Sequence, residues 1–142
     1  MIGTKITIKK PDEKEYEQVL ELVEKFWLDN INMDREQFTV ISDNGKVLAF
    51  ARMKEYPDAV ELGTLGVAKE FRDKGYGSKL VKHLLDEAKG EVYVVTTMFK
   101  FNANLGFVTV QEYPDSIKQK VNVCAKDFHV AEPYFVMKWE KK

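Results

Sequence analysis

The chain begins with an alternation of polar and apolar residues and then changes to a helical spacing of its apolar residues. The alternation over residues 4–9 predicts a first strand. Asp12 and Glu15 have the spacing of a capping box, in which two side chains satisfy free N–H groups at the start of a helix. Apolar side chains then recur at every third or fourth position over residues 16–27. We therefore expect a helix that begins after Asp12 and ends near Asn30.

The next part of the chain has the pattern of three strands. Residues 38–41 and 46–53 are strand-like, and the connection between them ends in Asn44-Gly45. This pair readily adopts the positive φ angles of a tight hairpin, so the two segments are expected to pair antiparallel. A further strand is predicted over residues 59–67.

The second half of the chain alternates between helical and strand patterns. A loop over residues 68–76 precedes a helix that begins at Gly77. The later elements are a strand over residues 91–96 that is covered on both faces, a strand over 106–110, one or two helical turns over 116–121 and a closing strand over 134–139. The sum is a mixed sheet of roughly seven strands with a few helices, an α+β or mixed α/β fold.

Composition narrows the class of protein. The chain has 142 residues, 44% of them hydrophobic, which fits one domain over residues 1–142 with a real core. A net charge of −1 gives no electrostatic reason to expect nucleic-acid binding or an anionic membrane. The apolar runs are short and the first residues lack the pattern of an export signal, so a cytoplasmic protein is expected. The single Cys124 excludes an internal disulfide, and two isolated histidines predict no metal site.

The chemistry of the chain is indicated by a loop between a predicted strand and a predicted helix. Arg72, Gly75 and Gly77 form an R-x-x-G-x-G pattern, in which glycines let the backbone approach a ligand closely. The free N–H groups and positive dipole end of the following helix make this an anion site, suited to phosphate. Lys74 adds a further positive charge. The alternative is a glycine-rich start of a helix with solvated charges, and Leu80 stands where a dinucleotide-binding motif needs its third glycine.

The order of elements, together with this loop, resembles the GNAT superfamily of N-acetyltransferases. The likeness extends from Ile6 to Trp139 and includes the spacing from Val67 to the R-x-x-G-x-G loop and the later Leu-Gly-Phe segment at 105–107. The resemblance implies a single GNAT-like domain with a mostly antiparallel sheet, flanked by helices and splayed at an acetyl-CoA slot. It also implies an acetyl-CoA-dependent N-acetyltransferase, and no metal cofactor is expected beside acetyl-CoA.

The resemblance assigns the acetyl-CoA contacts to two segments. The pyrophosphate would bind the amides of Arg72, Asp73, Lys74, Gly75, Tyr76, Gly77 and Ser78. The pantetheine arm would pair, like an added strand, with the backbone of Leu65, Gly66 and Val67. From sequence alone Gly66 is a bulge or a tight packing position in a strand, and the resemblance implies a bulge there that opens the acyl-CoA slot. The backbone N–H of Val67 would bind the oxyanion.

Transfer to an amine requires removal of a proton, and Glu61 is the candidate general base. Many relatives place a carboxylate here, although a charged strand residue could also simply face solvent. Many relatives also have a tyrosine as general acid where this chain has Asn102, and an amide cannot serve. Either Tyr113, Cys124 or Tyr134 substitutes, or the thiolate leaves unaided. Cys124 is otherwise expected to be a packing residue.

A narrower resemblance is to the amino-acid N-acetyltransferases, which include N-acetylglutamate synthases. It rests on residues 96–101, on Tyr113-Pro114 and on Cys124, whereas Gly63 and Asp127 depart from that pattern.

We therefore expect transfer to a primary amine of a small molecule, with an amino acid as one acceptor class. The alternatives are an acyl-CoA-binding sensor without turnover and a transferase that modifies proteins or peptides. Loops over residues 30–37 and 114–133 are expected to shape the acceptor pocket, and relatives often form homodimers. Trp27, at the end of the first predicted helix, is expected in the core.

Overall fold

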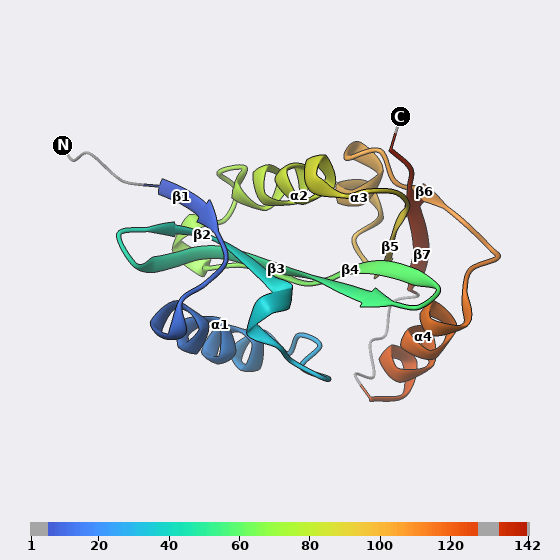
Figure 1. Ribbon diagram of the computed structural model, residues 1–142, viewed down its shortest axis with the longest axis horizontal. Helices are drawn as coiled ribbons and strands as arrows, with labels where there is room; N and C mark the ends of the chain where they lie inside the picture. The colour runs from blue at the N-terminus through green and yellow to red at the C-terminus, as the bar shows by residue number, and fades with distance from the viewer. Residues whose placement is uncertain (1–5, 128–133, 142) are drawn as a thin grey trace. The chain divides into compact units, whose positions relative to one another are not determined.

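The computed structural model describes residues 6–127 and 134–141, with the backbone alone for residues 123–127 (Figure 1). Its elements in chain order are β1 (Ile6–Lys9), α1 (Glu13–Lys25), the 3-10 helix η1 (Arg35–Gln37), β2 (Phe38–Asp43), β3 (Lys46–Tyr56), β4 (Ala59–Val67), the 3-10 helix η2 (Lys69–Phe71), α2 (Tyr76–Glu87), β5 (Val92–Thr96), α3 (Phe99–Asn104), β6 (Val108–Thr109), α4 (Asp115–Asp127) and β7 (Phe135–Trp139).

The strands form one sheet in the order β1-β2-β3-β4-β5-β7-β6. Strands β4 and β5 run parallel, whereas β1 with β2, β2 with β3, β5 with β7 and β6 with β7 are antiparallel. The predicted class, α+β with a mostly antiparallel sheet of about seven strands, is confirmed. In the pairing of β4 with β5, Glu61 lies opposite Tyr93 and Leu62 lies opposite Val94. Strand β4 continues beyond these residues to Val67.

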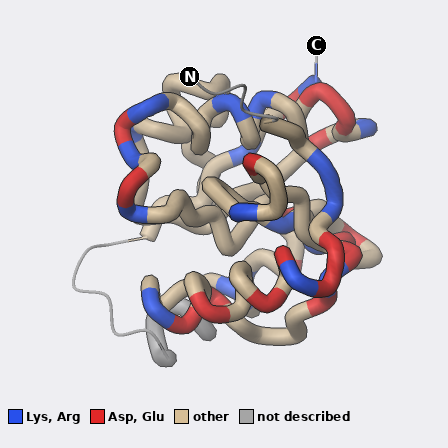
Figure 2. Tube along the Cα trace, turned by 90° about the vertical axis from the view of Figure 1, so that its left-hand side faces the viewer, with Lys and Arg blue, Asp and Glu red and all other residues tan. Residues whose placement is uncertain are grey.

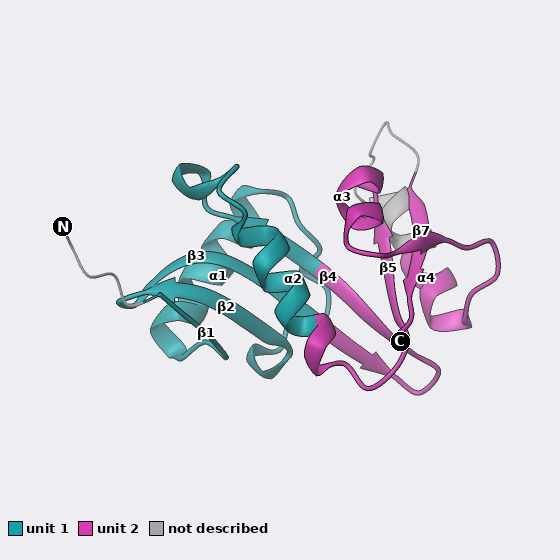
Figure 3. Ribbon diagram, turned by 90° about the horizontal axis from the view of Figure 1, so that it is seen from above, with its two compact units in different colours: residues 1–52, 64–84 teal, residues 53–63, 85–142 magenta. Residues whose placement is uncertain are grey.

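The chain divides into two compact units, coloured separately in Figure 3. Unit 1 consists of residues 1–52 and 64–84, and unit 2 of residues 53–63 and 85–142. Strand β4 contributes to both units, with the division between Gly63 and Thr64. Basic and acidic residues are interspersed along the trace, in keeping with the small net charge (Figure 2).

Unit 1 is built around strands β1–β3, with α1 and α2 on opposite faces (Figure 1). Its core joins buried residues of α1, β2 and β3, namely Val19, Val23, Phe38, Val40, Val47 and Phe50. The hairpin between β2 and β3 turns at Asn44 (φ +51°) and Gly45 (φ +88°), as the sequence predicts.

Helix α1 begins as predicted and ends earlier than predicted. The Asp12 carboxylate accepts the N–H of Glu15 at 2.8 Å, and the Glu15 carboxylate accepts the N–H of Asp12 at 3.0 Å, so the capping box is present. The helix stops at Lys25, and Trp27 then adopts φ +56°. This left-handed turn takes the indole off the apolar face of the helix and leaves it 86% exposed. The prediction that Trp27 lies in the core is wrong.

Unit 2 is built on the antiparallel pair β5 and β7, with α4 against β5. Tyr93, Ile117 and Val136 form its buried cluster, against which Val121 also packs. Helix α4 is longer than the one or two turns predicted, because Ile117 and Val121 place its apolar side on the sheet. Cys124 lies in this helix, and its side chain is outside the described part of the structure, as is the whole of His129.

Within the described residues, no helix is long and apolar enough to cross a membrane. The same residues hold no group of three or more His, Cys, Asp or Glu side chains that could bind a metal ion.

We expect the Glu15→Gln variant to have a free energy of unfolding about 1 kcal/mol below that of the wild type at pH 7. Burial raises the pKa of Glu15, but hydrogen bonds from Lys9 and from the Asp12 backbone outweigh it, so the pKa lies below its ordinary value. A lowered pKa gives stability that is complete above the unfolded value of about 4.3 and is lost as the pH falls through the folded value. Denaturant titrations should therefore show the two proteins converging in acid.

The exposed Glu13, in the same helical turn, provides the matched control. Glu13→Gln should change stability much less, and a Glu15→Gln deficit that stays constant down to pH 3 would contradict the assignment.

Candidate active site

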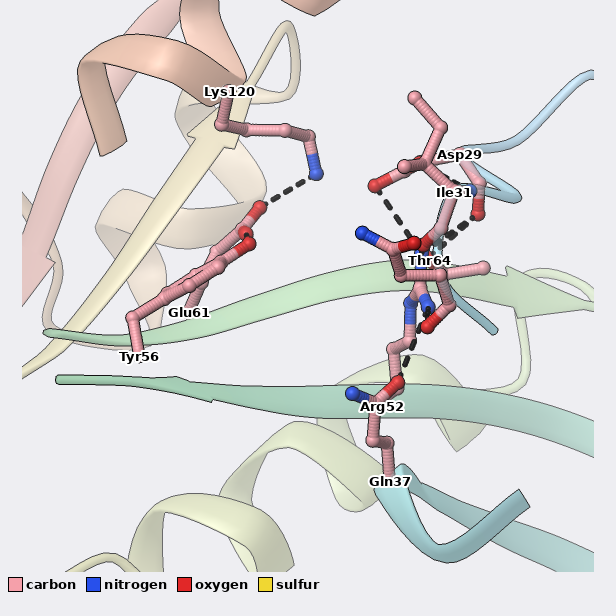
Figure 4. Close-up of polar contacts among 9 residues, drawn as sticks. Asp29, Ile31, Gln37, Arg52, Tyr56, Glu61, Thr64 and Lys120 are labelled. Atoms are coloured by element: carbon pink, nitrogen blue, oxygen red, sulfur yellow. Dashed lines mark hydrogen bonds and ion pairs between the residues drawn. The ribbon is translucent and has the colours of Figure 1, made fainter. Parts of the chain in front are cut away.

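Glu61, the candidate general base, lies in β4 with its side chain fully buried in unit 2. Its Oε2 atom accepts a hydrogen bond from Lys120 Nζ at 2.6 Å, and its Oε1 atom accepts one from the hydroxyl of Tyr56 at 2.9 Å (Figure 4). Lys120 comes from helix α4 and is itself buried. The alternative that Glu61 faces solvent is therefore wrong. Its carboxylate is paired and hydrogen-bonded, as buried charges must be.

Gly63 lies directly beside this pair. A Cβ atom at Gly63 would lie 3.5 Å from Glu61 Oε2 and 3.7 Å from Lys120 Nζ. The absent side chain therefore borders both the carboxylate and the ammonium group. A larger side chain at this position would contact both groups.

The regular course of β4 is interrupted at Thr64, whose φ is +50°. A β-branched residue in this region is a genuine outlier. Gly66, two residues later, is a tight packing position, since a Cβ atom there would come within 2.4 Å of Phe50 Cζ. Phe50 is fully buried and cannot move away cheaply. The unusual backbone thus lies at Thr64, and Leu65 and Val67 follow it half-buried.

The loop over residues 68–75 connects the end of β4 to the start of α2. Asp73 and Gly75 adopt φ angles of +63° and +85°, and a Cβ atom at Gly75 would meet nothing within 4 Å. The carbonyl of Gly75 accepts the N–H of Lys79 at 3.0 Å, so it takes the first helical hydrogen bond. The N–H groups at the start of a helix have no partner within it. Tyr76, Gly77 and Ser78 occupy this first turn and are half-buried, whereas residues 72–75 are exposed.

Three basic side chains of unit 1 lie on or near this loop. Arg72 Nε donates to the carbonyl of Val67 at 3.0 Å, and its guanidinium lies 4.6 Å from the ring centre of Phe26. Lys74 and Lys46 both approach the ring of Phe71, at 5.9 Å and 5.2 Å. The loop therefore combines backbone donors with positive charge, which is the chemistry of a phosphate site.

Asn102, at the position expected of a general acid, is buried in helix α3. Its Nδ2 group donates to the Met98 carbonyl at 3.0 Å and to Thr96 Oγ1 at 3.3 Å. The amide therefore stabilises the turn between β5 and α3. Among the substitutes considered, Tyr113 and Tyr134 are half-buried in unit 2, and the Cys124 side chain is outside the described part.

Sequence reasoning missed Tyr56 and Lys120. Lys120 is 59 positions from Glu61 in the chain, so no local spacing joins them. The available signal was that Lys120 follows Ile117 by three residues, on the apolar face of its helix.

Residues 6–107 match the sequence model of the Acetyltransferase (GNAT) family, and the chain belongs to this family. Among characterised relatives it is similar to the amino-acid acetyltransferases of Neisseria meningitidis serogroups A and B, with 28% identity over 72 residues. That alignment covers 49% of this chain and 16% of the relative, so the chain spans a small part of the relative's length.

Solved structures share the fold. N-acetylglutamate synthase from Neisseria gonorrhoeae, complexed with coenzyme A and N-acetyl-glutamate, superposes with a TM-score of 0.76 at 17% identity, over 98% of this chain and 36% of that one. Rv2747 from Mycobacterium tuberculosis, in complex with CoA, gives a TM-score of 0.73 at 19% identity, over 96% of this chain and 99% of that one. Escherichia coli ElaA gives 0.68 at 15% identity, over 97% and 100% of the two chains.

We expect Gly75→Asp to weaken coenzyme A binding by at least about tenfold, or ~1.4 kcal/mol. The new carboxylate would stand among the backbone donors predicted to bind a diphosphate, and like charges repel. A side chain at Gly75 would clash with no neighbouring atom, so its cost to the fold is limited to the strain of a positive φ. Isothermal titration with coenzyme A measures the change.

Gly45 offers a matched control, because it has nearly the same φ and equally open surroundings. Gly45→Asp therefore introduces the same backbone strain and charge at the hairpin, and it should bind coenzyme A like the wild type. Equal affinity of both variants would remove the loop from the binding site.

Proposed function

We propose that this protein transfers an acetyl group from acetyl-CoA to a primary amine of a small molecule, with amino acids as the acceptor class. Residues 1–142 act as one N-acetyltransferase domain in this proposal. The observation that carries it is the loop before α2, where a left-handed Gly75 opens the first turn of a helix amid basic side chains. The similarity to amino-acid acetyltransferases supports the acceptor class.

Two segments hold the cosubstrate in this proposal. Residues 72–78 bind the pyrophosphate through backbone N–H groups, assisted by the charges of Arg72 and Lys74. The backbone of Leu65–Val67 pairs with the pantetheine arm in the manner of an added strand. Gly66 belongs to this segment, and its lack of a side chain lets the strand pack directly on Phe50.

The reaction forms a C–N bond and breaks the C–S bond of the thioester. An amine is mostly protonated at neutral pH, so Glu61 accepts a proton, directly or through water, before the amine attacks. Lys120 and Tyr56 hold the Glu61 carboxylate in place, and two of its roughly four acceptor positions remain for this task. The N–H of Val67 stabilises the oxyanion. The sulfur leaves as a thiolate, which needs no acid when the thiol pKa is near 8.5.

We expect Glu61→Gln to lower kcat by about 10²- to 10³-fold near neutral pH, within the usual range for loss of a general base. The deficit should shrink as the pH rises through the pKa of the acceptor, about 8 for an α-amino group, because the amine then loses its proton without help. The pH profile of kcat, measured for both proteins, tests this role.

Glu55→Gln changes an exposed glutamate of β3 in the same unit and serves as the control, with a profile like that of the wild type. A Glu61→Gln deficit of constant size from pH 6 to pH 10 would exclude Glu61 as the base.

A sensor that binds acyl-CoA without turnover is the second candidate. Two observations favour it: Asn102 replaces the usual acid, and both carboxylate oxygens of Glu61 already accept hydrogen bonds. Thiol release separates the two functions, because a sensor binds acetyl-CoA and leaves it intact.

The acceptor is identified by measuring thiol release from acetyl-CoA in the presence of amino acids, polyamines or peptides. We expect amino acids to give the highest kcat/KM. Release with peptides alone would indicate a protein-directed transferase, and tight binding without release would indicate the sensor.

A further inference from the structure

Arg52 is a fully buried arginine in the middle of β3. Its guanidinium forms an ion pair with the carboxylate of Asp29, with Nη2 3.3 Å from Oδ2. Replacing buried ion pairs by apolar side chains of similar size often leaves stability unchanged or raises it. The stability gained from the ion pair therefore does not explain an arginine at this position. The other hydrogen bonds of the guanidinium do explain it.

The guanidinium fixes the segment between α1 and β2. Nη2 donates to the carbonyls of Asp29 at 3.2 Å and Ile31 at 3.0 Å. Nη1 donates to the carbonyl of Asn32 at 3.3 Å and to Gln37 Oε1 at 3.2 Å. Carbonyls of one irregular segment thus converge on one side chain (Figure 4). An apolar residue at this position could not hold them.

The same guanidinium reaches strand β4. Arg52 Nε donates to Thr64 Oγ1 at 2.8 Å, and the Thr64 hydroxyl donates to the carbonyl of Asp29 at 3.0 Å. The Thr64 hydroxyl is therefore held by two hydrogen bonds, one as acceptor and one as donor. Its φ of +50° is a strained conformation for threonine, and such strain persists where the surroundings over-determine it. Asn32, another partner of Arg52, also has a positive φ, +53°.

We propose that Arg52 is a positioning residue for acyl-CoA binding, which acts by holding Thr64 in its left-handed conformation. The inference rests on the proposed function, in which Leu65–Val67 pair with the pantetheine arm. The torsion at Thr64 sets the direction in which this backbone leaves the residue. Because the guanidinium also holds residues 29–32, the segment expected to shape the acceptor pocket and the acyl-CoA strand are fixed by one group.

The test is to remove the hydroxyl of Thr64 and to measure the affinity for coenzyme A. Thr64→Val keeps the size and branching of the side chain but cannot bridge Arg52 and Asp29. We expect Kd for coenzyme A and KM for acetyl-CoA to rise about five- to tenfold, with kcat at saturating acetyl-CoA changed less than twofold. Thr64→Ser keeps the hydroxyl and should restore both constants to within about twofold of the wild type.

A second variant covers the outcome that Thr64→Val does not fold. Glycine adopts φ +50° without strain, so Thr64→Gly should fold although it lacks the hydroxyl that bridges Arg52 and Asp29. Without that bridge, nothing holds the backbone of residue 64 in one conformation. It should show the same rise in Kd. Val19→Ala, a cavity in the core of unit 1, controls for stability: it should lower Tm and leave Kd unchanged.

The outcomes distinguish a failure of the proposed function from a failure of the positioning role of Arg52. A wild-type protein that does not bind coenzyme A overturns the proposed function. A wild type that binds, with Thr64→Val or Thr64→Gly folded and binding equally well, overturns the positioning role and leaves the function intact. If Thr64→Val or Thr64→Gly lowers Tm without changing Kd for coenzyme A, the contact between Arg52 and Thr64 serves stability alone.

Discussion

The structure depends on how the Thr64 hydroxyl is held between Arg52 and the carbonyl of Asp29. Strand β4 pairs with β5 near its start, and in the proposed function its backbone binds a cosubstrate further on. A regular strand would continue its alternation of faces, whereas β4 buries both Glu61 and Leu62 and changes course at Thr64. The strained torsion at Thr64 thus lies between Glu61 and Leu62, which pair with β5, and residues 65–67, which bind the cosubstrate in the proposed function.

Each compact unit contains a buried ion pair, Arg52 with Asp29 in unit 1 and Glu61 with Lys120 in unit 2. Removing either charge from water costs several kcal/mol, which attraction alone repays only with good geometry and further hydrogen bonds. Both pairs meet this condition, through backbone carbonyls around Arg52 and the phenol beside Glu61. Such pairs are costly to break by removing one partner, and this keeps the groups in fixed positions.

Features that depend on neighbouring residues could be predicted from the sequence. The bounds of β4, the Asn44-Gly45 hairpin and the start of α1 at Asp12 follow from short-range hydrogen bonds and torsional preferences. The end of α1 was predicted less well, because a single left-handed residue, Trp27, overrides an apolar pattern that continues past it. The candidate site divides in the same way. The loop before α2 has a linear pattern, but the partners of Glu61 come from the end of β3 and from the distant helix α4, and periodicity does not report such contacts.

The two tryptophans of the chain lie in different units, Trp27 in unit 1 and Trp139 in unit 2. The indole of Trp27 is almost fully solvated, whereas that of Trp139 packs at 3.3 Å from where Gly106 would carry a Cβ atom. The indole of Trp27 is therefore in water, whereas Trp139 is half-buried, so that Trp27 is expected to emit at the longer wavelength. Each half of the molecule thus carries its own optical reporter, so that the melting of one half can be distinguished from the melting of the other.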